Sequence, residues 1–157
     1  MADTVREKIF ADLVTTLSGI STANGYDNNI ASVQRWDMNG NNKVGVPAII
    51  VNSGPEKNDD GKAYDLTHCL LTVFLELWVR QNEAESAAMP TDKLLNSLLG
   101  DIKKSLAEDV TRGGNAFDTE VTDVETFETV EGQQHAGLVV TIEIEYRHKQ
   151  TDPKTAG

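Results

Sequence analysis

The stretch that decides the fold lies within residues 64–80, and its centre reads Cys69-Leu70-Leu71-Thr72-Val73-Phe74-Leu75-Glu76-Leu77-Trp78-Val79-Arg80. Every second residue from Cys69 to Val79 is apolar, without one polar interruption. Successive side chains of a β-strand point to opposite faces, so this period indicates a strand with one buried face. The run is also long enough for a helix, the competing interpretation, but its β-branched and aromatic residues favour the strand.

The second face of this strand mixes large apolar and charged side chains, namely Leu70, Thr72, Phe74, Glu76, Trp78 and Arg80. Aromatic residues are common anchors of protein interfaces. We therefore single out Leu70, Phe74 and Trp78 as candidates for a subunit interface. A helix of the same chain that covered them would explain the pattern equally well, and the sequence leaves both interpretations open.

Two amphipathic helices are expected on either side of the long strand. Thr4 and Glu7 have the spacing of a capping box, and apolar residues then recur at helical intervals, which predicts a helix over residues 5–18. Gly19 is placed to end it in the left-handed conformation. The second helix opens at Pro90, and its apolar stripe consists of Leu94, Leu95, Leu98, Leu99, Ile102 and Leu106.

The remaining segments predict shorter strands. A weak signal within residues 28–37 and the apolar run at residues 48–51 indicate two strands. The loop Asn39 to Gly45 would join them, and the polar, breaker-rich residues 52–61 are expected to form an exposed, mobile connection. The segment Phe117 to Arg147 reads as a closing hairpin with a loop at residues 132–135. A shift in apolar phase predicts a bulge near Thr122 or Asp123.

The expected order is helix, strand, strand, strand, helix, strand, strand. This order predicts an α+β fold in which a mainly antiparallel sheet of about five strands is packed by two helices. The length of 157 residues suits one domain. We expect a single domain over residues 1–150 and a flexible C-terminal tail over residues 151–157.

Composition limits the classes of function. The formal net charge of -11 and the pI near 4.6 argue against specific nucleic-acid binding, although a channel through which DNA slides would benefit from the same repulsion. No apolar run reaches the length of a membrane helix, so no membrane partner is expected. The N-terminal residues lack the pattern of a secretory signal, so the protein is expected to stay where it is made.

No motif for chemistry stands out. Cys69 is the only cysteine and is expected to be buried, and the histidines are scattered, at His68, His135 and His148. Asp37, Asn39 and Asn41 imitate a calcium loop, but Asn42 replaces its turn glycine and Ala48 its glutamate. Acidic residues are abundant without a pairing pattern, so they read as a solvated face. We therefore predict no catalytic residue, cofactor or metal site.

The element order resembles the tail-terminator family of long-tailed bacteriophages, also called the minor tail protein U-like or tail-completion family. The likeness covers roughly residues 4–150 and rests on the N-terminal helix, the strand Pro47-Ala48-Ile49-Ile50-Val51 that ends near Gly54-Pro55-Glu56, the strand Leu70 to Arg80, the leucine-rich helix and the hairpin Phe117 to Arg147. The resemblance implies a homohexameric ring that caps the tail tube, stops its polymerisation and joins the tail to the head connector. It implies no catalytic residues.

The resemblance also implies partners and a location. These are other copies of the chain, the tail-tube protein and the head-tail connector protein, at the head-proximal end of the tail in the virion and in the host cytoplasm during assembly. Related folds serve as head-completion or neck proteins and as tail-tube subunits, which are the alternatives within this class. A small enzyme or a non-viral adaptor is the alternative outside it, and an enzyme would need a pocket with convergent polar groups.

Overall fold

The computed structural model describes residues 1–35, 45–60, 65–80, 90–126 and 135–157. Two α-helices, a short 3-10 helix and six strands make up this part of the chain. In order they are α1 (Val5–Ser18), η1 (Thr22–Asn24), β1 (Ser32–Arg35), β2 (Ala48–Asp59), β3 (Leu66–Arg80), α3 (Thr91–Glu108), β4 (Asp118–Thr126), β5 (His135–Lys149) and β6 (Asp152–Ala156).

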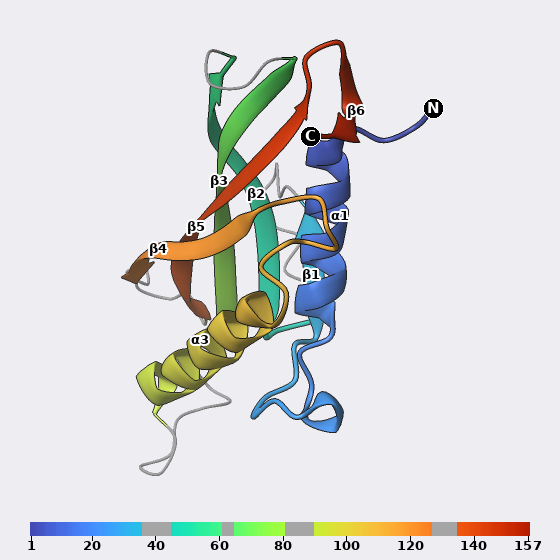
Figure 1. The fold of residues 1–157 in the computed structure, drawn as a ribbon. Helices are drawn as coiled ribbons and strands as arrows, with labels where there is room; N and C mark the ends of the chain where they lie inside the picture. Colours follow the sequence, from blue (N-terminus) through green and yellow to red (C-terminus); the bar gives the residue numbers. More distant parts are fainter. Residues whose placement is uncertain (36–44, 61–64, 81–89, 127–134) are drawn as a thin grey trace.

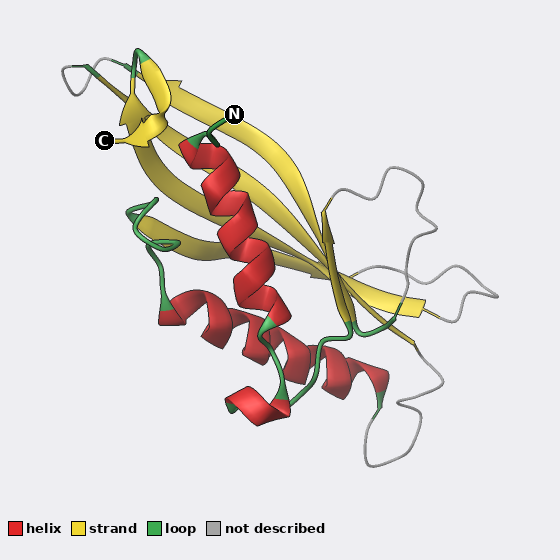
Figure 2. Cartoon of the chain, turned by 90° about the vertical axis from the view of Figure 1, so that its right-hand side faces the viewer, coloured by secondary structure: helices red, strands yellow, loops and turns green. Residues whose placement is uncertain are grey.

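The sheet has the strand order β1-β2-β3-β5-β4, and β6 pairs with β5 beyond this path. Only β1 and β2 pair in parallel, and the other pairs are antiparallel. Both α-helices lie on one side of the curled sheet (Figures 1 and 2). The predicted α+β class, a mainly antiparallel sheet packed by two helices, is therefore confirmed.

Helix α1 begins and ends where its sequence indicates, but its closing turn differs from the prediction. The Thr4 hydroxyl accepts a hydrogen bond from the backbone N–H of Glu7 at 3.1 Å, which satisfies one of the free donors of the first turn. Gly19 has φ -80°, so the left-handed conformation expected there is wrong. The chain instead continues through η1, and Gly25 supplies the left-handed residue, with φ 89°.

Strand β3 lies in the middle of the sheet and confirms the strand interpretation. Its residues alternate between buried and half-buried over almost its whole length. The buried residues form the inner face, which packs against α1 and α3 in one core. The inner-face residues of β3 are Cys69, Leu71, Val73, Leu75, Leu77 and Val79, each exposed by 1% or less.

Strand β2 continues to Asp59, so the predicted connection over residues 52–61 is wrong as far as Asp59, although Ser53, Pro55, Lys57 and Asn58 are exposed as expected. Long-range pairing with β3 explains the difference, because a bulge between Ser53 and Glu56 absorbs the local breakers and keeps the ladder in register. Gly54 is required at this bulge, since a Cβ there would lie 2.7 Å from the backbone oxygen of Thr72. The other predicted loop, up to residue 44, lies outside the described residues.

The closing hairpin is formed by β4 and β5. Their register shifts between Val121 and Asp123, which confirms the predicted bulge. Most of the loop expected at residues 132–135 lies outside the described residues. The segment after Gln150, expected as a flexible tail, contains strand β6, because Lys149 and His148 of β5 pair with it and Lys8 of α1 donates a hydrogen bond to the Lys154 backbone.

Candidate functional site

The outer face of the sheet, the side away from α1 and α3, carries the three residues predicted as an interface. Leu70, Phe74 and Trp78 are half-buried there, while the core residues between them point to the inner face. Because they are spaced by four, they form one row along β3. The two described α-helices pack on the inner face, and Figure 2 shows both on the same side of the sheet.

Part of the burial of this row comes from the sheet itself. A Cβ built on Gly54 would meet a ring carbon of Phe74 at 2.9 Å, so the ring lies against the bulge of β2. Trp78 lies opposite the small residue Gly137 of β5. The row is therefore held in place by neighbouring strands and still presents apolar surface outward.

The same outer face is acidic toward the β4 edge. The register directs carboxylates outward from both strands, namely Asp118, Glu120, Asp123 and Glu125 of β4 and Glu143 and Glu145 of β5. Asp118 lies directly opposite Glu145, and Glu120 opposite Glu143. Like charges in directly opposed positions destabilise a sheet. His68 Nε2 lies 2.6 Å from Glu145 Oε1, whereas no described cationic side chain forms an ion pair with Glu120 or Glu143.

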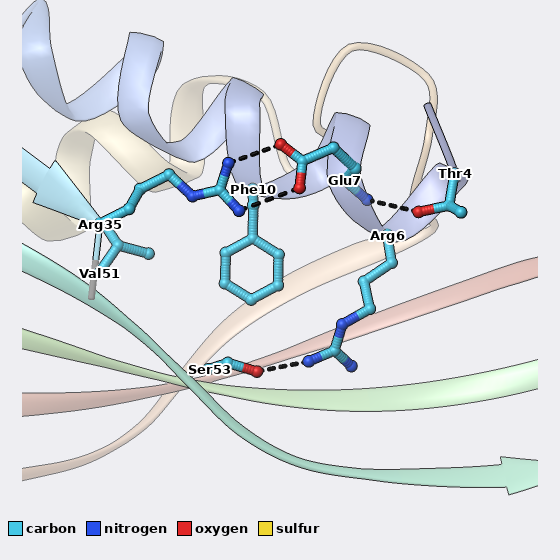
Figure 3. Close-up of a pocket in the computed structure, with 7 residues that line it drawn as sticks. All are labelled: Thr4, Arg6, Glu7, Phe10, Arg35, Val51 and Ser53. Atoms are coloured by element: carbon cyan, nitrogen blue, oxygen red, sulfur yellow. Dashed lines mark hydrogen bonds and ion pairs between the residues drawn. The ribbon is translucent and has the colours of Figure 1, made fainter. Parts of the chain in front are cut away.

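A second surface feature is a cleft of about 180 Å³ between the first turns of α1 and strands β1 and β2 (Figure 3). Phe10 lies between two guanidinium groups: the Cζ atom of Arg6 is 5.4 Å and that of Arg35 5.3 Å from the ring centroid. Cation–π attraction favours this arrangement. The complete lining consists of Thr4, Arg6, Glu7, Phe10, Arg35, Val51 and Ser53.

Both arginines of this cleft are held by carboxylates. Arg35 donates to the two Glu7 oxygens at 2.5 and 3.0 Å. This hydrogen bonding lowers the pKa of Glu7 and raises the pKa of Arg35. Arg6 donates to Glu56 at 2.9 Å and to the Ser53 hydroxyl. A guanidinium has five N–H donors, so donors remain on both groups, and the cleft suits a carboxylate carried on an apolar stem.

A buried polar network below the cleft positions Arg6. Tyr146 is 2% exposed, and its hydroxyl donates to Glu56 at 2.5 Å. Burial is the main cause that raises the pKa of Tyr146, and the bond to Glu56 adds to it. Arg6 and Tyr146 thus share one carboxylate oxygen, which ties the first turn of α1 to β2 and β5. Cys69 lies fully buried in the same region, where burial raises the pKa of its thiol.

The other residues considered for chemistry are dispersed. His135 is the first residue of β5. His148 lies near the other end of this strand, and its Nδ1 is 2.8 Å from the backbone oxygen of Lys149. No group of three potential metal ligands occurs among the residues that the structure describes. Of the calcium-like pattern, residues 37–42 lie outside this part of the chain, and Ala48 begins β2. No helix in the described ranges is long and apolar enough to span a membrane.

The cleft was not predicted from the sequence. Arg6 and Phe10 are four apart on α1, a spacing that places them on one helix face. Arg35 belongs to a strand predicted only weakly, and no local signal connects it with Phe10. Arg35 meets Phe10 because α1 packs across the β1 edge of the sheet.

Comparison with solved structures gives distant likenesses. No protein-family model and no curated protein matches the chain. A chain in the solved structure titled "Virion of native gene transfer agent (GTA) particle" is similar with 10% sequence identity and a TM-score of 0.36, over 90% of each chain. A likeness at this level assigns no function to the chain.

Proposed function

We propose that this chain is a non-enzymatic structural protein of a tailed-bacteriophage virion and acts as a tail terminator. In this role, copies form a ring that caps the tail tube, stops its polymerisation and joins the tail to the head connector. The observation that carries the proposal is the outer face of β3. The row of Leu70, Phe74 and Trp78 lies on the face opposite the hydrophobic core and is still partly exposed in the subunit. Burial of this row by a neighbouring subunit would therefore stabilise the assembly.

The order of the elements supports the same proposal. The helix before three strands and the helix before a closing hairpin are the features on which the resemblance to the tail-terminator family rests. Strand β6 and the parallel pairing of β1 with β2 add to that order without changing it. The proposed partners are other copies in a hexamer, the tail-tube protein and the head-tail connector protein.

The charge of the chain fits a position on the path of DNA. A subunit with a net charge of -11 repels phosphate groups, so a ring of such subunits does not hold DNA that passes through it. We propose no specific nucleic-acid binding. The acidic outer-face residues of β4 and β5 are a surface of this kind on the described part of the chain.

The test is removal of the gene from the virus that encodes it, followed by electron microscopy of the tails. We expect tubes of uncontrolled length that fail to join heads, and normal tails when the protein is supplied in trans. Gold-labelled antibody should mark the head-proximal tip of tails assembled without heads. Tails of normal length that join heads without the protein would refute the proposal. Label that stays on isolated capsids would identify a neck or head-completion protein, and label along the tube would identify a tube subunit.

A further inference from the structure

We propose that copies of this chain bind head to tail, with the acidic outer face of β4 and β5 of one copy docked on the cleft of Arg6, Phe10 and Arg35 of the next copy. The inference rests on the proposed ring-forming function and deepens it, because it names the two surfaces that meet. The occupant of the cleft is thus a second copy of the chain.

The topology places these surfaces at opposite edges of the sheet. Strand β4 ends the strand order on one side, and β1, which carries Arg35 as its last residue, ends it on the other. Two different surfaces on opposite sides of a subunit form a heterologous contact, which closes into a ring when the rotation between copies allows it. A contact of the acidic face with itself is excluded by repulsion between like charges.

Hydrogen-bond complementarity points to the cleft as the counterpart of the acidic face. The chain carries 25 acidic and 14 basic residues, so a second copy approaches favourably where guanidinium N–H donors face its carboxylates. The cleft provides two guanidinium groups around one aromatic ring; each is paired with one carboxylate of its own chain, Glu7 or Glu56, and keeps further N–H donors. On the other side, Glu120 and Asp123 are exposed on β4.

The acidic face itself also gives a reason for association, because like charges lie directly opposite each other on it. Docking also places cationic groups near Glu120 and Glu143, whose opposed charges destabilise the isolated subunit. The repulsion within one copy therefore favours association with the next.

The experiment reverses the charge of each surface and then combines the variants. One variant carries Arg35→Glu, and the other carries Glu120→Arg together with Asp123→Arg. Arg35 is preferred to Arg6, because its partner Glu7 is exposed, whereas the Glu56 partner of Arg6 is mostly buried. Two controls at exposed positions outside both surfaces match these changes in net charge: Lys103→Glu for the first variant, and Asp27→Arg together with Asp92→Arg for the second.

Self-association is measured by sedimentation at low salt, and in tails by co-expression of the variants. We expect each surface variant alone to associate at least about tenfold more weakly than the original chain. An equimolar mixture of the two should restore assembly, because each junction then joins opposite charges, and both controls should assemble normally. Variants that assemble as well as the original chain, or a mixture that fails to recover, would overturn the head-to-tail contact while the proposed ring function stands. An original chain that forms no homo-oligomer, free or in tails, would refute both.

Discussion

Truncation of Phe74 is the most direct test of the outer face as an interface. Phe74 is half-buried, and its ring lies against the Gly54 bulge of its own chain. A fully buried aromatic side chain removes roughly 150–250 Å² from water, and most of the Phe74 surface is buried within its own subunit, so at ~25 cal/mol per Å² this burial corresponds to roughly 3 to 4 kcal/mol. We therefore expect Phe74→Ala to lower the free energy of unfolding of the dissociated subunit by about 3 kcal/mol.

Leu75 provides a matched control, because it is the next residue of β3 and is fully buried on the inner face. Leu75→Ala should cost about 2 to 5 kcal/mol of folding stability, as expected for a core leucine, with no separate effect on assembly. Phe74→Ala should in addition weaken association by about 2 kcal/mol or more, or roughly 30-fold. Trp78→Ala should behave in the same way, and Leu70→Ala should have a weaker effect.

The assay pairs urea unfolding of the dissociated subunit with a measurement of assembly, either by the mass of rings or by complementation of tails that lack the terminator. Two outcomes differ in kind. If Phe74→Ala and Trp78→Ala unfold as easily as Leu75→Ala, and the folded fraction assembles with unchanged affinity, both residues belong to the core and the interface proposal is wrong.

Three further predictions concern stability. Gly54→Ala should destabilise the fold by about 1 to 3 kcal/mol in urea unfolding, because its Cβ would lie 2.7 Å from the Thr72 oxygen; an unchanged midpoint would show that the bulge moves freely. Arg112→Met should cost about 3 kcal/mol, since Arg112 is fully buried, donates to two backbone carbonyls and pairs with Asp12 at 3.2 Å; a neutral result in the same assay would contradict this. Hydrogen bonds from neighbouring residues, chiefly a hydroxyl, lower the pKa of Asp109, so its contribution is present above the unfolded carboxyl pKa and is lost as the pH falls through the lower folded value. Asp109→Ala should make the free energy of unfolding depend less on pH in this acidic range. An unchanged pH dependence would contradict the prediction.

The sequence by itself determined the elements whose apolar period is unambiguous. Strand β3 has six alternate apolar positions, and α3 has a leucine stripe. Each pattern identifies the buried face of its own element without long-range information, because burial of one face requires that period in a strand or a helix. The bulge near Asp123 could also be predicted from the sequence, since an extra residue in a strand shifts the alternation of its apolar positions.

Only the tertiary structure decided the extent of β2, the strand β6 and the closing conformation of Gly19. Each depends on hydrogen bonds to residues distant in the chain or on the path of the following turn, which local propensity does not contain. The cleft belongs to the same class: it exists because helix α1 packs beside β1 and brings Arg35 to Phe10, 25 residues away in the sequence. The sequence determined which faces must be buried, because that depends on side-chain period alone; packing decided which surface residues meet, because that depends on how the faces are brought together.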